Sequence, residues 1–303
     1  MIHRHEFHAM GSKMLAVVDG ENRPASLENV PLWFEDYEKS LSRFRLDSEL
    51  VRLNLHAGQP VKVSQTLWDV FQAAVEAENK SGGLINPLIL NALISAGYDK
   101  TFDKLPEYSL VALEDRIQFI PSLADVITDE TTRTICIPEG AQLDFGGIAK
   151  GWAAHQAMER LNLDGPALVN AGGDIAISGL NSDGKPWPIG IEDPFNPGTD
   201  FDLLYIEKGG IATSGRDYRH WMLNGRHQHH IIDPGTGRPA DTDIITSTVI
   251  APTVMEAETI AKAILISGSE RGLSWLDNDE TLAGLLVLEN GQCIESQNLQ
   301  KYY

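Results

Sequence analysis

The stretch LDFGGIAKGWAAHQAMERLNLDGPALVNAGGDIAI, residues 143–177, decides the fold of this chain. Apolar residues at helical spacing predict a helix over Ile148–Leu161. Two short apolar runs, Leu168-Val169 and Ile175–Ile177, predict strands with a glycine pair between them. Here and in the rest of the chain, helices and strands are interspersed without a regular βαβ rhythm, which favours an α+β fold over a doubly wound sheet.

The remaining segments follow the same two patterns. Strands are expected at Lys13–Val18, Ile117–Phe119, Thr134–Ile137, Ile189–Ile191, Leu203–Ile206, Thr246–Ile250 and Leu282–Leu288. Helices are expected at Leu27–Leu55, where the helix runs into a loop, at Leu67–Asn79 and at Val254–Ser267. The 303 residues allow one large domain, residues 1–303, or two closely packed lobes.

The composition limits the kinds of partner. A formal net charge of -19 argues against nucleic acid, whose phosphates would be repelled. No apolar run approaches the length of a membrane span, about 20 residues. The first residues, Met1–Phe7, show neither the apolar region of a signal peptide nor a lipid-acceptor cysteine. We therefore expect a cytoplasmic protein for the sequence as given, or an exported one if a leader precedes it.

A first motif lies where the helix of the opening stretch begins. Gly146-Gly147 would let a phosphate approach the backbone, and the helix N-terminus supplies free N–H donors. Lys150 lies in the first turn, where its charge is unfavourable to the helix dipole and a bound anion would offset it. A glycine turn followed by a solvent-exposed lysine explains the same residues equally well.

A second motif, Gly172-Gly173-Asp174, follows one expected strand and precedes another. The glycines permit positive φ and a close approach to a ligand. Asp174 could accept a hydrogen bond from a sugar hydroxyl or a flavin N–H group. In isolation, a simple hairpin turn is the better explanation.

The third motif combines Thr213-Ser214-Gly215, which we expect to be a hydroxyl-bearing turn, with His230 and Asp233. A neutral imidazole near pH 7 is a suitable general base, and Asp233 could orient it or bind a cation. No Gly-x-Ser-x-Gly pattern surrounds Ser214, which disfavours a serine hydrolase.

Together these motifs resemble the ApbE family of FAD:protein FMN transferases. Further blocks match the family pattern in order: Met10-Gly11-Ser12, Leu41–Phe44, Asp47–Leu50 with Asn54, Gly83–Pro87, Gly97-Tyr98 and His230–Gly237. The resemblance implies a T-fold-like arrangement of mixed and antiparallel sheets flanked by helices. It also implies a magnesium-dependent enzyme that moves FMN from FAD to a threonine or serine hydroxyl of a target protein. An FAD pyrophosphatase giving FMN and AMP, or a non-catalytic flavin-binding protein, remains an alternative.

The resemblance also assigns roles to residues. By analogy, His230 would be the catalytic base and Asp233 would support its loop. The FAD site would be lined by Met10, Gly11, Ser12, Lys150, Gly172, Gly173, Asp174, Thr213, Ser214, Gly215 and His230. FAD and a flavin-accepting protein are the expected partners.

The expected metal site departs from the family pattern. The family uses a backbone carbonyl, here that of Gly147, with an aspartate and a threonine where this chain has Glu258 and Lys262. A protonated lysine cannot ligate Mg²⁺ and would repel it. Lys262 either forms an ordinary i, i+4 pair with Glu258 or, as we favour, places its ammonium in the metal position. Asn86 and His155 also stand where the family has aspartate.

Overall fold

The computed structural model describes residues 1–106, 108–109 and 119–303, so the expected strand at Ile117–Phe119 lies outside them except for its last residue. The chain divides into two compact units. Unit 1 contains residues 1–35, 150–218 and 242–303, and unit 2 contains residues 36–149 and 219–241. Among the described residues, no helix has both the length and the apolar character needed to cross a bilayer.

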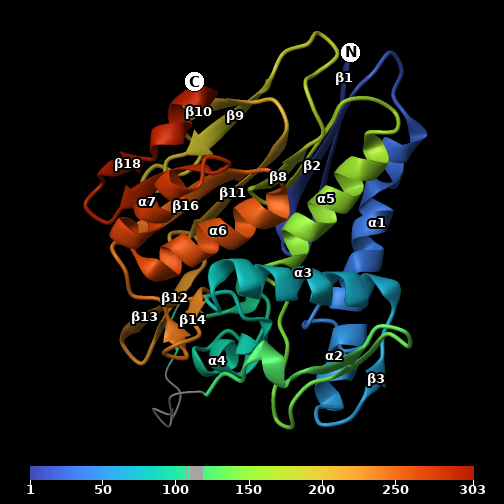
Figure 1. The fold of residues 1–303 in the computed structure, drawn as a ribbon, viewed down its shortest axis with the longest axis vertical. Helices are drawn as coiled ribbons and strands as arrows, with labels where there is room; N and C mark the ends of the chain where they lie inside the picture. The colour runs from blue at the N-terminus through green and yellow to red at the C-terminus, as the bar shows by residue number, and fades with distance from the viewer. Residues whose placement is uncertain (107, 110–118) are drawn as a thin grey trace. The chain divides into compact units, whose positions relative to one another are not determined.

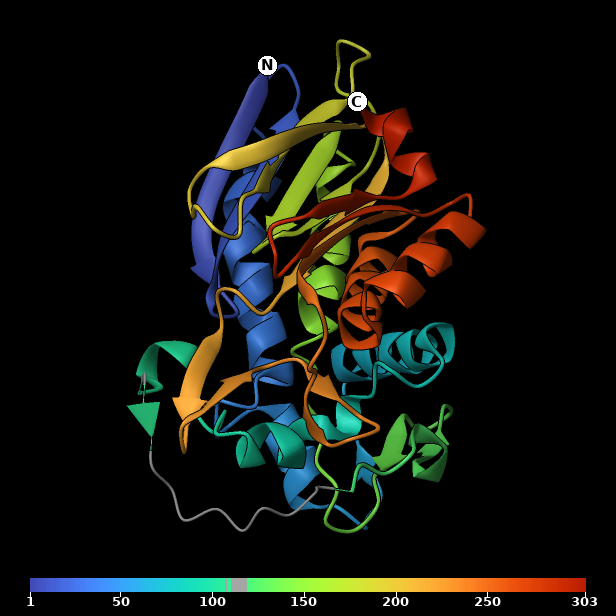
Figure 2. The same ribbon diagram turned by 90° about the vertical axis from the view of Figure 1, so that its left-hand side faces the viewer.

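Within the described residues, unit 1 is built on an eight-stranded sheet in the order β1-β2-β7-β8-β11-β16-β17-β18, with every neighbouring pair antiparallel (Figure 1). The strands are β1 (Ile2–Ala9), β2 (Ser12–Asp19), β7 (Ala167–Ala171), β8 (Asp174–Ile177), β11 (Gly209–Gly215), β16 (Ile244–Ala251), β17 (Ala283–Leu288) and β18 (Cys293–Glu295). Both chain ends lie at the same end of this unit (Figure 2).

The two faces of this sheet are covered differently. One face packs on the hairpin β9 (Trp187–Glu192) and β10 (Asp200–Ile206) and on the short helix η4 (Gln297–Tyr302). Alternating strand positions supply this core, as period-2 patterning requires: it contains Val17, Leu168, Ile175, Ile177, Trp187, Ile189, Ile191, Leu204, Ile206, Ile211, Ile250, Leu285, Val287 and Leu299.

Helices cover the other face. Helix α6 (Val254–Ser267) crosses β11 and β16, with α5 (Ala149–Leu161) beside it (Figure 1). Gly210 shows how closely α6 approaches, because a Cβ built there would lie 2.2 Å from the backbone of Val254. Helix α7 (Ser269–Asn278) and the first part of α1 (Ala25–Leu41) complete the unit.

Unit 2 combines the 17-residue helix α3 (Gln65–Ser81) with shorter helices and strands. Its other helices are α2 (Glu49–Leu55), η1 (Pro87–Ile89), α4 (Leu90–Ser95), η2 (Phe102–Lys104) and η3 (Leu123–Asp125). Its strands are β3 (Val61–Lys62), β4 (Tyr108–Ser109), β5 (Ile127–Asp129), β6 (Thr134–Cys136), β12 (His220–Leu223), β13 (Arg226–His229), β14 (Ile232–Asp233) and β15 (Arg238–Pro239). One core cluster joins α4 to β12 and β14 through residues such as Leu93, Tyr98, Trp221 and Ile232.

The structure confirms the α+β class and corrects two expected elements. The helix expected over Leu27–Leu55 is two helices, α1 and α2, and serine side chains bind the backbone between them. Ser42 Oγ accepts from the Phe44 N–H at 3.3 Å, and Ser48 Oγ accepts from the Val51 N–H at 3.1 Å and caps α2. The turn expected at Thr213-Ser214-Gly215 is instead the end of strand β11, paired with β16.

Candidate functional site

A buried group of charged side chains in unit 1 joins α5, β8 and α6. Lys150, in the first turn of α5, donates through Nζ to Asp174 Oδ2 at the start of β8. The same Nζ lies 3.6 Å from Glu258 Oε1 on α6. Lys262, one turn further along α6, places its Nζ 3.5 Å from the same oxygen. Thus two carboxylates and two ammonium groups from three elements form one cluster.

The cluster is held away from solvent. The exposed fractions of the side chains are 17% for Lys150, 15% for Lys262, 3% for Asp174 and 2% for Glu258. Burial, reinforced by the charge of Glu258, raises the pKa of Asp174 to about 6. Burial also opposes ionisation of Glu258, yet Lys262, Lys150 and the Gly151 N–H together hold the pKa of this carboxyl below its ordinary value.

Glu258 also caps the N-terminus of α5. Its Oε2 accepts from the backbone N–H of Gly151 at 3.0 Å, so this carboxylate takes one of the free donors that we expected to face a ligand anion. A Cβ at residue 151 would lie 2.6 Å from Glu258 Oε2, so any larger residue there would displace this carboxylate from its N–H donor. Lys150 is therefore a partly buried, paired lysine rather than a solvent-exposed one, and its partners are the two carboxylates.

The glycine motifs near this cluster are tips of neighbouring hairpins. Met10-Gly11 joins β1 to β2 with φ of 50° and 66°, and Gly172-Gly173 joins β7 to β8 with φ of 67° and 99°. Positive φ at both central residues is typical of a two-residue type I′ hairpin turn. Since β2 pairs with β7, the two tips are adjacent, and a Cβ at Gly172 would lie 2.7 Å from Cβ of Ser12.

The second motif is a hairpin turn, and its position also suits the ligand-binding role that was considered for it. Both hairpin tips are simple turns, and they also bring Met10, Gly11, Ser12 and the second glycine pair to the strand end where Asp174 begins. Residues from separate motifs that we expected to contact FAD therefore lie together at one end of the sheet.

Strand β11 places Thr213 and Ser214, two residues of the third motif, on opposite faces of the sheet. Ala212 pairs with Asp174, so Ser214, two residues on, has the same orientation as Asp174. Thr213 points to the other face, where its hydroxyl lies 2.9 Å from that of Thr248. Ser214 is buried opposite Ser247, whose hydroxyl has no hydrogen-bond partner among the described residues. Ser214 and Asp174 thus share the helix-covered face, and Thr213 does not.

The paired histidines belong to unit 2 and differ in their surroundings. His229, the last residue of β13, is buried, and its Nε2 lies 2.8 Å from the Ala240 carbonyl oxygen while its Nδ1 accepts from the Ile231 N–H at 3.3 Å. These partners assign the neutral tautomer with the proton on Nε2. Both ring nitrogens of His229 are therefore used in holding the backbone. His230, which follows β13, is the histidine of the pair to which the family pattern assigns the role of base.

Asp233 organises the turn that follows His230. Its Oδ1 accepts from the Gly235 N–H at 2.8 Å, and its carbonyl oxygen accepts from the Gly237 N–H at 2.8 Å. The turn closes the hairpin between β14 and β15, in which Asp233 pairs with Arg238. This geometry fits the loop-supporting role expected for Asp233. The position of His230 and Asp233 relative to the Lys150 cluster stays a prediction, because they belong to the other unit.

The residues expected to bind Mg²⁺ do not fit that ion. Both carboxylate oxygens of Glu258 already have partners: Oε2 accepts from a backbone N–H, and Oε1 lies near two ammonium groups. Lys262 supplies a positive charge where an oxygen ligand was expected, and Mg²⁺ requires near-octahedral oxygen ligands. Gly147, whose carbonyl was the remaining expected ligand, belongs to unit 2 and not to the unit that holds Glu258 and Lys262. The described residues contain no group of three or more His, Cys, Asp or Glu side chains placed to hold a metal ion.

Unit 2 contains a second buried ion pair that the sequence analysis did not single out. Arg43 Nε lies 2.7 Å from Asp144 Oδ2, and the guanidinium stacks 4.1 Å from the Phe44 ring centroid and 4.6 Å from that of Tyr98. Asp144 Oδ1 also accepts from the Gly146 N–H at 2.8 Å. The glycine pair before α5 is thus fixed by a carboxylate that an arginine holds in place.

Asn86 has a structural reason to differ from the family aspartate. Its Oδ1 accepts from the Leu88 N–H at 2.8 Å and caps η1, and its Nδ2 donates to the Pro121 carbonyl at 2.9 Å. A carboxylate could make the first bond and not the second. The other changed position, His155, lies partly exposed on α5.

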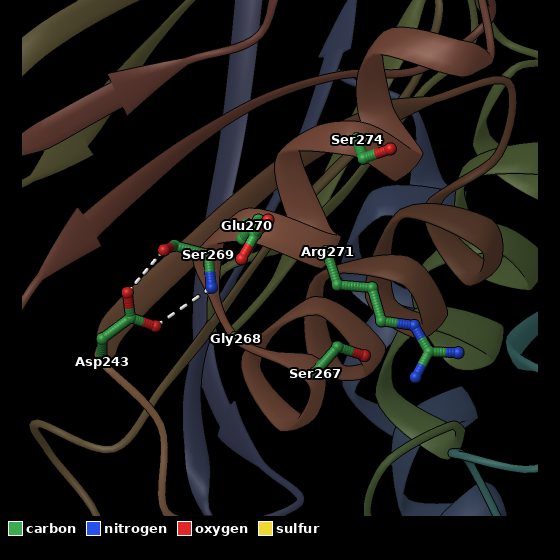
Figure 3. A pocket seen from close by; sticks show the side chains of 7 residues that line it. All are labelled: Asp243, Ser267, Gly268, Ser269, Glu270, Arg271 and Ser274. Atoms are coloured by element: carbon green, nitrogen blue, oxygen red, sulfur yellow. Dashed lines mark hydrogen bonds between the residues drawn. The ribbon is translucent and has the colours of Figure 1, made fainter.

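A pocket in unit 1 contains none of the expected site residues (Figure 3). It lies around the start of α7, where Asp243 accepts from the Ser269 N–H at 3.0 Å and from the Ser269 hydroxyl. It is lined by Asp243, Ser267, Gly268, Ser269, Glu270, Arg271 and Ser274. Asp243 thus caps α7, which explains its place in the pocket structurally.

Comparisons with known proteins agree with the motifs. The ApbE family model matches residues 10–286. An FAD:protein FMN transferase of Treponema pallidum is 33% identical over 269 residues, covering 83% of this chain and 74% of the relative. One of Vibrio cholerae is 33% identical over 248 residues, covering 79% and 72%.

Solved structures show the same fold. The ApbE protein of Thermotoga maritima superimposes with a TM-score of 0.88 at 24% identity, covering 100% of this chain and 99% of that one. The flavin transferase ApbE of Vibrio cholerae gives a TM-score of 0.80 at 23% identity, with 100% and 99% covered.

Proposed function

The chain belongs to the ApbE family, and from this we propose that it is an FAD:protein FMN transferase, which moves FMN from FAD to a threonine or serine hydroxyl of a target protein. The sequence identity to relatives of that name supports the proposal. The observation that carries it is the buried Lys150–Asp174–Glu258–Lys262 cluster. Two partly buried ammonium groups around buried carboxylates, one of which follows the Gly172-Gly173 hairpin tip, suit a phosphate-bearing ligand better than they suit the stability of a core.

The proposed reaction is a phosphoryl-type transfer. The hydroxyl oxygen of the acceptor forms a bond to the phosphorus on the FMN side of the diphosphate. The bond from that phosphorus to the bridging oxygen breaks, and AMP leaves with the electron pair. Such a reaction depends chiefly on positioning and on neutralising charge around the phosphorus.

We assign roles in this reaction as follows. Lys150 neutralises charge on the diphosphate, and the buried hydroxyls of Ser214 and Ser247 donate to the ligand from the same face of the sheet. His230 takes the proton of the acceptor hydroxyl, since both nitrogens of His229 are engaged with the backbone. Asp233 supports the loop after His230 through the Gly235 N–H.

The roles of the remaining FAD contacts follow from the hairpin tips. Met10-Gly11 and Gly172-Gly173 let the ligand approach the backbone, because all four residues adopt positive φ in tight turns, and Ser12 lies against Gly172 beside them. Asp174 accepts a hydrogen bond from the flavin nucleotide. No step in this proposal is assigned to a metal ion, since Lys262 is incompatible with the expected ligand set.

The test is to incubate the purified protein with FAD and a set of threonine- and serine-containing peptides, with and without Mg²⁺. A gain of one FMN group on a peptide, with AMP released in equal amount, is the expected result. Release of AMP and FMN without peptide modification would favour a pyrophosphatase instead. Retention of intact FAD after desalting, with no AMP, would favour a flavin-binding protein without catalysis.

A further inference from the structure

The positive and negative charges of the Lys150 cluster balance without a metal ion. Asp174 and Glu258 supply two negative charges, and Lys150 and Lys262 supply two positive charges, joined by the ion pairs Lys150–Asp174, Lys150–Glu258 and Lys262–Glu258. We infer that the Lys262 ammonium takes the place of a divalent cation in this chain, so that binding of the flavin nucleotide needs no metal. The identity of that nucleotide rests on the proposed function.

The atoms around Glu258 suit ammonium groups rather than a metal ion. One oxygen, Oε2, accepts from the Gly151 N–H at 3.0 Å. The other, Oε1, lies 3.5 Å from Lys262 Nζ and 3.6 Å from Lys150 Nζ. Mg²⁺ requires several oxygen ligands at about 2.1 Å. The groups that surround the Glu258 carboxylate are hydrogen-bond donors instead.

The pair of Lys262 and Glu258 also differs from an ordinary helix-surface pair. Lys39 and Asp36 on α1 provide the comparison: their atoms lie 2.9 Å apart and their side chains are 50% and 71% exposed. The corresponding fractions are 15% for Lys262 and 2% for Glu258. A pair on the solvated surface gains little from its charges, whereas a buried carboxylate requires a cation near it. Lys262 meets that requirement together with Lys150.

The two lysines are also suited to the charge of the proposed ligand. The negative charge of a diphosphate must be balanced in a buried site, and an ammonium with its three donors binds a phosphate as a point charge. A divalent ion added to this cluster would be repelled by both ammonium groups, and the two carboxylates that could attract it already have these ammonium groups as partners. The same two lysines that exclude the ion can therefore contact the diphosphate directly.

The direct test is a titration with Mn²⁺, followed by electron paramagnetic resonance, on the wild-type protein without nucleotide. Wild type should show no stoichiometric binding. Lys262→Thr removes the ammonium and supplies an oxygen, so it should bind one Mn²⁺ at least tenfold more tightly. Lys262→Arg keeps the charge and should behave as wild type, and Lys39→Thr is the matched control for loss of a helical lysine. One Mn²⁺ bound equally tightly by wild type and Lys262→Thr would overturn the inference.

A second measurement needs no variant and separates the inference from the proposed function. The affinity of wild type for FAD, followed by flavin fluorescence, should change less than twofold between excess EDTA and millimolar Mg²⁺. An affinity that collapses in EDTA would contradict the inference while leaving the proposed function intact. Absence of FAD binding under both conditions would contradict the proposed function, and the Mn²⁺ titration would still decide the role of Lys262.

Discussion

At the scale of single residues, the contrast between the adjacent histidines leads to the first prediction. His230→Ala should leave the affinity for FAD nearly unchanged and lower the rate of AMP release by about 10²–10⁴-fold, the usual contribution of a general base. His229→Ala should instead lower stability, by about 1–3 kcal/mol, because it removes the acceptor of the Ile231 N–H and the bond to the Ala240 carbonyl. Thermal unfolding and AMP assays on both variants distinguish the roles. A large loss of FAD affinity in His230→Ala would make His230 a binding residue.

Asn86 gives a second prediction at this scale. Asn86→Asp restores the family residue but replaces the donor that binds the Pro121 carbonyl with an acceptor. We expect a loss of about 1–3 kcal/mol in the free energy of unfolding at pH 8, measured by urea denaturation. Asn91→Asp is the control, since Asn91 Nδ2 donates to the Gly140 carbonyl at a more exposed position and its replacement should cost less. Equal stability of wild type and Asn86→Asp would show that the Pro121 bond contributes nothing.

The sequence could identify candidate site residues, but it could not show which side chains or backbone groups they contact. His230 was separable from His229 only by the family pattern, since both are histidines in one short segment. The cap that Glu258 provides for Gly151 joins residues 107 positions apart, and no local pattern records such a contact. The same holds for Arg43, whose partner Asp144 lies in a different motif.

At the scale of elements, the start of α5 offers the third prediction. Alanine is a better helix former than glycine by about 1 kcal/mol, so Gly151→Ala would be expected to stabilise an isolated helix. Here the added Cβ would lie 2.6 Å from Glu258 Oε2 and force that carboxylate away from its N–H donor. We predict a net loss of about 1–3 kcal/mol in stability by urea denaturation. Gly179→Ala, where the Cβ would have open space, should change stability by less than about 0.5 kcal/mol. A stabilised Gly151→Ala would refute the cap.

The elements that could be predicted are those with a clear period. Helix α6 was predicted with its bounds at Val254–Ser267, and α5 to within one residue, because apolar positions recur and Gly268 ends α6. Strand β11 was not predicted. The first four residues of its sequence, GGIATSG, are buried on both faces, so it lacks the alternation of polar and apolar residues that marks a half-exposed strand. Its glycines and hydroxyls resemble a turn until the pairing with β16 is known.

At the scale of the whole molecule, most of the candidate site in unit 1 could be predicted, and its electrostatics could not. The family pattern gave Lys150, Asp174, Glu258 and Lys262 as separate positions. Antiparallel pairing of β7, β8 and β11 and the placement of α6 on their face bring these side chains together. Whether Lys262 was a surface residue or part of the site depended on burial, which is a property of the folded unit.

The protonation of this cluster couples to global unfolding and gives the fourth prediction. The pKa of Asp174 is raised by burial to about 6 in the folded protein, from an ordinary value of 3.8. Between roughly pH 4 and pH 6 the folded state therefore holds more protons than the unfolded state, and stability falls as pH rises through this window. The contribution is at most about 3 kcal/mol. Glu258, with its lowered pKa, has the opposite effect: its contribution to stability is present above its ordinary pKa of 4.5 and is lost as pH falls below that value.

The measurement is urea denaturation of wild type and Asp174→Asn at pH 5 and pH 8. The variant lacks the titrating carboxyl, so its stability relative to wild type should be more favourable at pH 8 than at pH 5, by about 1–3 kcal/mol. Asp193→Asn is the control: hydrogen bonds from Asn196 and the Phe195 N–H hold the pKa of that exposed carboxyl below its ordinary value, so it is ionised at both pH values. If the difference between Asp174→Asn and wild type were the same at pH 5 and pH 8, the raised pKa of Asp174 would be wrong. The balance of charge between the two carboxylates and the two lysines would then need a different description, with both carboxylates ionised throughout.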